Sequence, residues 1–335
     1  MALIFIDGFD DQAYSRKWIS TLTAAPSFAE TPRYGMGYCF KPGSSAGFMT
    51  KPFEPTPEIV CGFAFKVDSL SVAHILWSST DDGGASYHQR VQVSTSGQVQ
   101  AMRSTTVLAS SATGLIVGGA WNYIEIRVTL ADTGGIFQIR LNGQEVINYT
   151  GDTRNGGAAT NFGSISLGLP TAVDAAVTYD DLYILDTTGT APQNTFLGEV
   201  VVQTLLPSGE GEHSDFTPIG SPNNWENVDD VPPSTTDYNA SSTVGAKDSY
   251  ELSNLVGSVG MIFGIQENII ASKTGVGAAN LKSLVRSGGA DYTQPAVALG
   301  ASPQWYGAIR ETNPATSGAW TAMAVNSLEI GAEVA

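Results

Sequence analysis

The chain holds 335 residues, of which only 14% are charged while 37 are Gly and 16 are Pro. This composition is poor in helix-forming Lys and Glu and rich in turn formers, so it predicts an all-β protein that is long enough for two domains. The formal net charge of −16, from 32 acidic and 16 basic residues, argues against nucleic acid or an anionic membrane surface as a partner, because the electrostatic force would be repulsive.

Neither a leader peptide nor a membrane insertion is expected from the sequence. Residues 1–6 form a short apolar run without the basic flank of a secretory signal. No stretch approaches the roughly 20 apolar residues that a membrane-spanning helix needs. The two cysteines, Cys39 and Cys61, are too few for a disulfide framework, and both lie in apparent strands. Buried free thiols are therefore expected.

The first third of the chain is predicted to form short strands separated by turns. Residues 34–40 (YGMGYCF) predict a short strand, and residues 59–67 (IVCGFAFKV) and 74–78 predict two more. Residues 87–93 pair naturally with 98–103 across a Ser-Thr-Ser-Gly turn. Short strands at this spacing are typical of a β-sandwich.

A three-stranded meander is predicted in the middle of the first domain. Residues 121–130 (WNYIEIRVTL) have an apolar side chain at every second position from Ile124 onward, which indicates a strand with one buried face. A second strand is expected over 136–141, and the dipeptide Asn142-Gly143 is a strong hairpin signal before 144–147. The order of the three strands therefore follows from local sequence.

This meander resembles the late strands of laminin-G or concanavalin A-like jelly rolls. Residues 5–11 (FIDGFDD) with Trp18 are similar to the entry strand of such domains in phage proteins, and residues 177–186 (VTYDDLYILD) are similar to their closing strand. The resemblance implies a concanavalin A-like antiparallel β-sandwich over residues 1–190. It also implies a bacteriophage virion protein, either a tail or baseplate component or a capsid decoration, located in the virion and assembled in the host cytoplasm.

A second, β-rich attachment domain is expected over residues 191–335. A strand is predicted over 197–206, and residues 259–273 and 281–286 are predicted to form a long hairpin. The polar passage 207–247 has few strand signals, so we expect an extended segment that lies on a surface or orders against a neighbouring subunit.

The end of the chain is predicted to be a strand followed by a short helix. Residues 305–310 predict the strand, and Thr321 is expected to cap the helix, which Gly331 is expected to end. Residues 312–314 (TNP) and 325–329 (VNSLE) are similar to the ends of phage tail or capsid-associated proteins.

The sequence shows no familiar catalytic constellation. The paired carboxylates of concanavalin A-like glycan hydrolases are missing, and the acidic cluster at 210–215 lies in a Gly- and Pro-rich passage. The histidines His74, His88 and His213 are dispersed, without the spacing of metal ligands, and Ser164 and Ser258 lack a nucleophile elbow. The protein is therefore expected not to be an enzyme.

Calcium is the one cofactor that the sequence brings into consideration. Asp7 and Asp10 lie near the start of the first domain, and Asp180 and Asp181 lie near its end. Hard cations prefer clustered oxygen ligands, and edge loops of the resembled family sometimes hold calcium. The alternative is that these aspartates only bond to turn backbone, as Asp commonly does. No other cofactor is expected.

The candidate binding residues are three aromatic side chains in predicted loops, namely Trp225, Tyr238 and Tyr292. They are candidates for contact with a sugar face or with another subunit. The expected function is that of a non-enzymatic virion protein that attaches to a host-surface glycan. Its expected partners are other virion proteins and copies of itself, in a homo-oligomer or repeated array. The alternative is a carbohydrate-binding protein or a glycan hydrolase of the concanavalin A-like class.

Overall fold

The computed structural model describes residues 2–84 and 87–335, and the chain divides into two compact units. The first unit comprises Met1–Asp10 and Lys17–Val202, and the second comprises Asp11–Arg16 and Gln203–Ala335. Sequence analysis placed the division near residue 190, whereas the structure places residues 191–202 with the first unit.

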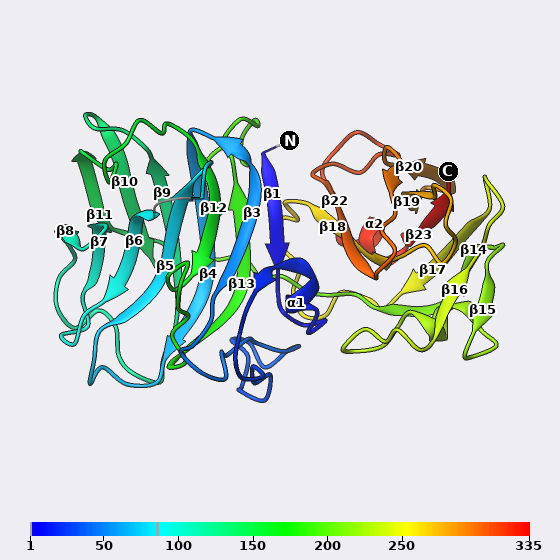
Figure 1. Ribbon diagram of the computed structural model, residues 1–335, viewed down its shortest axis with the longest axis horizontal. Helices are drawn as coiled ribbons and strands as arrows, with labels where there is room; N and C mark the ends of the chain where they lie inside the picture. Colours follow the sequence, from blue (N-terminus) through cyan, green and yellow to red (C-terminus); the bar gives the residue numbers. More distant parts are fainter. Residues whose placement is uncertain (1, 85–86) are drawn as a thin grey trace. The chain divides into compact units, whose positions relative to one another are not determined.

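The first unit is a sandwich of two antiparallel sheets, which Figure 1 shows as two layers. In spatial order, the six-stranded sheet contains β1 (Leu3–Asp7), β13 (Val177–Leu185), β4 (Glu58–Val67), β9 (Trp121–Thr129), β10 (Gly135–Leu141) and β11 (Gln144–Gly151). The seven-stranded sheet contains β2 (Ile19–Ser20), β3 (Met49–Thr56), β12 (Phe162–Leu167), β5 (His74–Asp81), β6 (Tyr87–Val93), β7 (Val99–Arg103) and β8 (Thr106–Ser110). The predicted all-β, concanavalin A-like sandwich is confirmed.

The core of the sandwich lies between the two sheets and is rich in aromatic side chains. Phe63 on β4 and Tyr179 on β13 are buried with ring centroids 5.9 Å apart, and Trp77 on β5 is fully buried. On β9, Ile124 and Ile126 have no exposed surface, which confirms the predicted inward face. Each such side chain removed from water stabilises the fold by roughly 1.5–3 kcal/mol.

The opposite face of β9 is also buried, so the prediction of a single buried face is wrong. Residues 197–202, predicted to begin a strand, instead run without strand pairing beside this face. The amide N–H of Gly198 donates to Glu125 Oε1 at 2.8 Å, and that of Leu197 donates to the Tyr183 hydroxyl at 3.2 Å. Glu125 is consequently 1% exposed, although it alternates with inward-facing residues.

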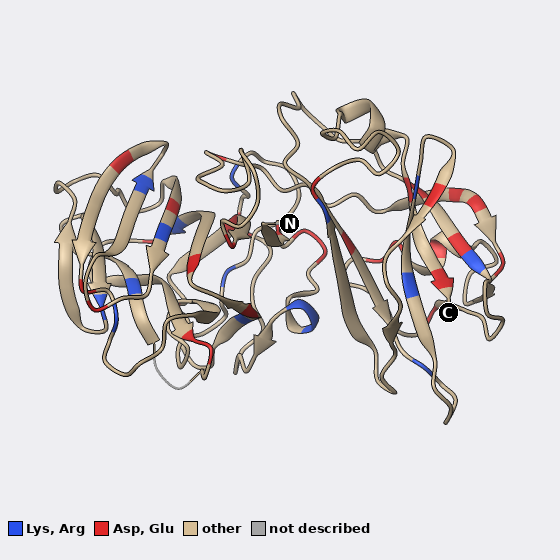
Figure 2. Ribbon diagram, turned by 90° about the horizontal axis from the view of Figure 1, so that it is seen from above, with Lys and Arg blue, Asp and Glu red and all other residues tan. Residues whose placement is uncertain are grey.

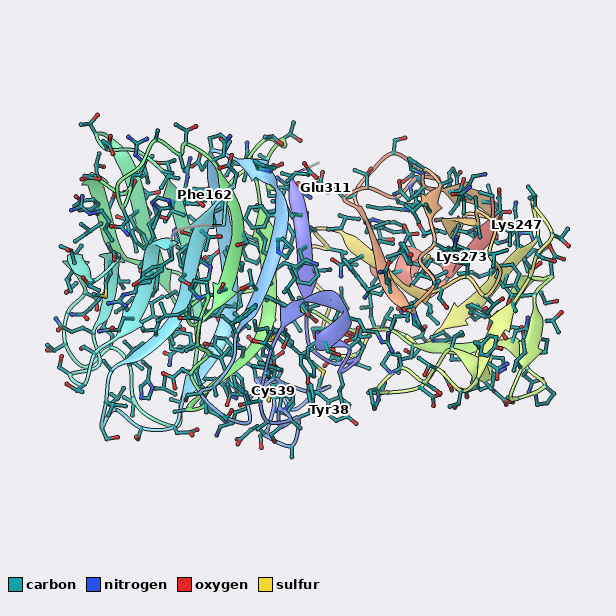
Figure 3. All side chains as sticks on the ribbon, viewed as in Figure 1. Tyr38, Cys39, Phe162, Lys247, Lys273 and Glu311 are labelled. Atoms are coloured by element: carbon teal, nitrogen blue, oxygen red, sulfur yellow. The ribbon has the colours of Figure 1, made fainter. Side chains whose placement is uncertain are left out.

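Residues 34–40 do not form the predicted strand. Only Phe40 is bridged to a strand, through Tyr179 on β13. Tyr38 and Cys39 lie on the irregular connection between β2 and β3 (Figure 3). Both cysteines are unpaired and buried, as predicted. Burial raises the pKa of the Cys39 thiol to about 12 and that of Cys61 higher still, so both remain protonated at neutral pH.

The second unit contains three further sheets. The largest consists of β14 (Pro207–Ser214), β17 (Lys247–Leu252), β23 (Glu329–Val334), β19 (Asn280–Ser287), β20 (Ala290–Thr293) and β21 (Val297–Ala298). The two small sheets pair β15 (Thr217–Ile219) with β16 (Tyr238–Ala240), and β18 (Ile265–Ala271) with β22 (Gln304–Arg310). The helical elements of the chain are α1 (Tyr14–Lys17), the 3-10 helix η1 (Asn224–Asn227) and α2 (Ala322–Asn326).

Strand pairing in the second unit differs from the prediction. The long hairpin expected from 259–273 and 281–286 does not form, because β18 pairs with β22 while β19 pairs with β20 and β23. The passage 207–247 is not devoid of structure, since it contains β14, β15, η1 and β16. Its ordering by contact between subunits remains a prediction.

The short C-terminal helix and its cap are confirmed. The Thr321 side chain accepts a hydrogen bond from the Ala324 amide at 3.2 Å, as an N-cap does. The helix ends at Asn326 rather than near Gly331, which lies in β23. Trp320, Val325 and Leu328 from this region pack with Val285 in the core of the unit. Within the described part of the chain, no helix is long and apolar enough to span a membrane.

The largest sheet of the second unit also carries an ion-pair network, where Figure 2 shows acidic and basic residues close together. Asp291 accepts from His213 Nε2 at 2.8 Å, from Lys247 Nζ at 2.8 Å and from an Arg286 guanidinium N–H at 2.9 Å. Burial alone would raise the pKa of Asp291, but these three donors outweigh it and lower the pKa to about 2. Lys247 also pairs with Glu333, and Arg286 also pairs with Glu212 and Glu329, so the network ties several strands together and is structural.

Candidate functional site

The structure does not bring the three aromatic candidates together in one site. Trp225 lies in η1 and is partly buried, and Tyr238, on neighbouring β16, is 43% exposed. Tyr292 lies in a different sheet, on β20, and its carbonyl accepts a hydrogen bond from Arg310 at 2.8 Å. Their proposed contact with a glycan or a subunit remains a prediction.

The four aspartates considered for calcium have protein donors close to their oxygens. Asp7 accepts from Lys17 Nζ at 2.5 Å and from Trp18 Nε1 at 2.8 Å. Asp10 Oδ1 accepts from the Tyr38 amide at 2.7 Å. Among residues 2–84 and 87–335, no group of three or more His, Cys, Asp or Glu side chains has the arrangement of a metal site. Calcium binding by these residues remains a prediction.

Asp180 and Asp181 form a buried acidic pair on β13. The Asp180 carboxylate accepts from the amides of Arg33 at 3.2 Å and Asp181 at 2.9 Å. Asp181 accepts from the Val202 amide at 2.8 Å. Burial, followed by the neighbouring Asp181 charge, raises the pKa of Asp180 to about 8, and burial raises that of Asp181 to about 6. The pair therefore releases its protons near neutral pH.

The histidines are held by protein partners. Its ring nitrogens lie 3.0 Å from Asp174 Oδ2 and 2.7 Å from the Ser69 carbonyl. His88 is 1% exposed, and its Nδ1 accepts from the Asn155 amide at 2.9 Å. A neutral His88 ring therefore carries its proton on Nε2, which lies 3.3 Å from Asp81 Oδ2.

A polar pocket of about 340 Å³ opens at one end of the sandwich. It is formed by the β7–β8 turn, the β9–β10 turn and the connection from β11 to β12. Its volume falls in the range of about 300–1,000 Å³ that is usual for small-molecule sites. The lining consists of charged, hydroxyl and amide side chains and one glycine: Arg103, Ser104, Thr105, Thr106, Asp132, Asp152, Arg154, Asn155 and Gly156.

A buried hydrogen-bond network adjoins this pocket. Thr153 has no exposed surface, and its hydroxyl donates to the Thr129 carbonyl at 2.6 Å. The Gln89 side chain donates to the Thr153 carbonyl at 2.7 Å, which ties the β11–β12 connection to β6. Asn155 is held next to it through the His88 ring. Because these residues belong to the rigid sandwich, the lining side chains are preorganised.

The charges in the pocket compensate one another. Arg103 pairs with Asp152, and Arg154 pairs with Asp132 through two guanidinium nitrogens, Nε lying 2.7 Å from Oδ1. The hydrogen bond from Arg154 lowers the pKa of Asp132. The formal charges of the two arginines and two aspartates sum to zero. Each pair still offers hydrogen-bond donors and acceptors to a ligand. Hydroxyl groups, which both donate and accept, match such a lining.

This pocket was not predicted from the sequence, in which neither Asp132 nor residues 152–157 (DTRNGG) were considered as a site. The available signal was the combination of Asp, Arg and Asn with two glycines a few residues after the predicted strand 144–147. Local sequence could not show that these residues meet the β7–β8 turn, because that turn is distant along the chain.

No model of a known protein family matches this chain, and no curated protein does. Among solved structures, the cellulose induced protein Cip1 is 14% identical with a TM-score of 0.40, over 54% of this chain and 96% of that one. An endo-beta-1,4-glucuronan lyase from the fungus Trichoderma reesei is 13% identical with a TM-score of 0.35, over 50% and 89% of the two chains. A Bacillus subtilis protein of unknown function with a galectin-like fold is 11% identical with a TM-score of 0.39, over 56% and 96%.

The prediction that the protein is not an enzyme is corrected by these neighbours. They include the glucuronan lyase, an alginate lyase and a sialidase. The comparisons show no link to a phage or a virion. At these identities and TM-scores, no residue or reaction is transferred from them to this chain.

Proposed function

We propose that the N-terminal sandwich binds a glycan and holds one neutral sugar residue in the polar pocket. The observation that carries this proposal is the pocket itself, which is about 340 Å³ in volume and is lined by two compensated Arg–Asp pairs. A sugar ring presents adjacent hydroxyl groups that can accept from a guanidinium and donate to a carboxylate. Loops on a rigid β scaffold are a common place for such recognition.

The lining also determines the expected affinity. It contains no aromatic side chain on which a sugar ring could stack, so binding to one site is expected to be weak. Several copies engaging one polysaccharide would strengthen the interaction through effective concentration. Multivalent presentation of the protein is therefore the appropriate format for detecting binding.

The test uses a tryptophan that fills the pocket without breaking its ion pairs. Thr105 is exposed and lines the pocket, so Thr105→Trp should occupy the sugar position. Thr95, exposed in the β6–β7 turn, provides the matched control Thr95→Trp. A glycan array probed with multimerised protein should show neutral-sugar binding by wild type and Thr95→Trp and at least a tenfold loss for Thr105→Trp. Equal binding by both variants, or no binding by wild type, would refute the proposal.

Two additions to this experiment address related predictions. Incubation with bound polysaccharides and measurement of new reducing ends reports hydrolysis or elimination. Binding with calcium and with a chelator tests whether the aspartates around Asp10 and Asp180 contribute through an ion. The virion assignment is tested separately by mass spectrometry of purified particles, in which the chain should occur at structural copy number.

A further inference from the structure

The outer face of the seven-stranded sheet carries a polar row that crosses its central strands. The register places Thr50, Ser166, Ser78, Arg90 and Met102 side by side on β3, β12, β5, β6 and β7, strands that Figure 1 shows next to one another. Register partners project from the same face of a sheet. The adjacent residues along these strands project from the opposite face of the sheet. They are Leu167, Trp77, Val91 and Ala101, and all four are fully buried in the core. The row therefore faces away from the core, although within it only Thr50 and Arg90 are partly exposed, while Ser78, Ser166 and Met102 are buried.

Arg90 differs from every other arginine of the chain. Each of the others donates to an oxygen or, like Arg140, lies over an aromatic ring. The Arg90 side chain makes no hydrogen bond or ion pair with any residue that the structure describes. Its Nε is buried without a partner, while the residue as a whole remains partly exposed. The guanidinium carries four further N–H donors, on Nη1 and Nη2, to offer to a ligand.

No neighbour of Arg90 in its own row or in the row of Gln92 accepts a hydrogen bond from its side chain. Ser78 Oγ donates to the Gly168 carbonyl at 2.7 Å, and the hydroxyls of Thr50 and Ser166 bond to each other at 2.7 Å. In the adjacent row, Gln92 donates to Gln100 at 3.1 Å. Although the chain contains 32 acidic residues, none stands in these two rows; two residues along β6 in the other direction, His88 Nε2 lies 3.3 Å from Asp81 Oδ2. Arg90 is thus the one charged side chain of the two rows.

We propose that this face binds a carboxylate-bearing sugar, a uronic acid residue of a glycan, with its carboxylate on the Arg90 guanidinium. This inference deepens the proposed glycan function and names an acidic sugar beside the neutral one. A guanidinium matches a planar carboxylate in a two-point geometry, and the partly exposed amide side chains of Gln92 and Gln100 match sugar hydroxyls. The negative net charge of the protein disfavours densely charged glycans, which is consistent with a single cationic position.

The face adjoins the pocket through the ladder of β7 and β8. Met102, beside Arg90, pairs with Val107, and Arg103 pairs with Thr106 on the next rung. Arg103 and Thr106 both line the pocket. Because successive side chains alternate between the two faces of a strand, Arg103 projects from the opposite side of β7 to Met102, at the end of the strand where the pocket begins.

The test compares an acidic oligosaccharide with its uncharged form. The full chain is titrated calorimetrically at low salt with a β-1,4-linked oligoglucuronate and with the methyl ester of the same oligomer. Wild type should bind the acid at least tenfold more tightly than the ester. Arg90→Gln should weaken acid binding by about tenfold to a hundredfold, the range of a charge-assisted hydrogen bond, and leave ester binding unchanged.

Two further variants separate this site from overall charge and from folding. Lys273→Gln removes one positive charge from the second unit and should leave binding unchanged, because the Lys273 side chain donates to the Gly277 carbonyl of its own loop. Arg90→Lys keeps the charge but loses the two-point geometry, so intermediate affinity is expected. Thermal unfolding of both Arg90 variants should match wild type.

The outcomes distinguish this inference from the proposed function of the pocket. Equal acid binding by wild type and Arg90→Gln, or equal affinity for acid and ester, overturns the role of Arg90. A sulfated neutral oligosaccharide that binds more tightly than the uronate, in an Arg90-dependent manner, overturns the choice of a carboxylate. If Thr105→Trp has no effect while Arg90→Gln abolishes acid binding, the pocket proposal fails and the Arg90 proposal stands. If Thr105→Trp abolishes neutral-sugar binding while Arg90→Gln has no effect on acid binding, the pocket proposal stands and the Arg90 proposal fails.

Discussion

Replacing Asp180 by Asn should make the sandwich more stable at alkaline pH. Burial, and next the charge of Asp181, raise the pKa of Asp180 from 3.8 to about 8, so the folded state holds this proton more tightly than the unfolded chain does. The stabilising contribution is complete below the unfolded pKa near 3.8. It is lost as pH rises through about 6, where Asp181 ionises, and about 8, where Asp180 does.

The magnitude follows from the size of the shift. Each pKa unit corresponds to about 1.4 kcal/mol, so a rise of about four units sets a ceiling of about 6 kcal/mol. Rearrangement of the surrounding chain reduces this, and an asparagine amide also loses one of the two backbone hydrogen bonds that Asp180 accepts. That loss is the same at every pH. We therefore expect the stability of Asp180→Asn relative to wild type to rise by at least about 2 kcal/mol between pH 5 and pH 8.5.

Hydrogen exchange of peptides from β4 and β13 measures this stability for the first unit alone. Asp82→Asn, in an exposed turn of the same sandwich, is the matched control and should show no such trend. A relative stability that stays constant between pH 5 and pH 8.5 would refute the reasoning, because the Asp180 carboxyl would then titrate alike in the folded and unfolded states.

Three other substitutions test the fold. Asp291→Asn should lower the unfolding free energy of the second unit by about 2 kcal/mol at pH 7, because the hydrogen bonds from Lys247, Arg286 and His213 outweigh burial and hold the Asp291 pKa near 2. In urea titrations this loss of stability should fade as pH falls from about 4 toward 2, and a pH-independent loss contradicts the reasoning. Thr321→Ala should cost about 1 kcal/mol through the lost N-cap, measured by urea denaturation, and an unchanged midpoint contradicts the cap. Gly62→Ala should destabilise the sandwich by about 1–3 kcal/mol in thermal unfolding, because the new Cβ would lie 2.2 Å from Tyr183 Cε1; a wild-type melting temperature would show that the ring moves freely.

Sequence predicted those parts of the fold that depend on neighbours along the chain. The meander of β9, β10 and β11 follows from alternation and from Asn142-Gly143, whose residues both have positive φ in the turn. The Thr321 N-cap likewise depends only on residues that are close in sequence, because its hydroxyl accepts from the Ala324 amide. Such features need only a few adjacent residues, so one sequence suffices to identify them.

Features that depend on distant partners were missed. Residues 197–202 have strand composition, but Glu125 and Tyr183 hold their backbone beside β9, and these partners lie far back along the chain. Strand β18 resembles a hairpin partner of β19, yet it pairs with β22. The propensity of a segment does not specify which of several strands it joins.

The candidate sites were hidden for the same reason. The row containing Arg90 collects Thr50, Ser78 and Ser166 from strands that are scattered through the sequence. The only local signal was the polar alternation of Arg90 and Gln92 on β6, which is also typical of an ordinary solvent-facing strand. The register of the sheet revealed that no carboxylate accompanies Arg90.

The most direct test of glycan binding by this sandwich is a crystal structure of the full chain with an oligoglucuronate that ends in a neutral sugar. The account predicts a uronate carboxylate within about 3 Å of the Arg90 guanidinium and the neutral sugar between the Arg103–Asp152 and Arg154–Asp132 pairs. A saccharide bound elsewhere on the chain, with Arg90 and the pocket both unoccupied at saturating concentration, would contradict it.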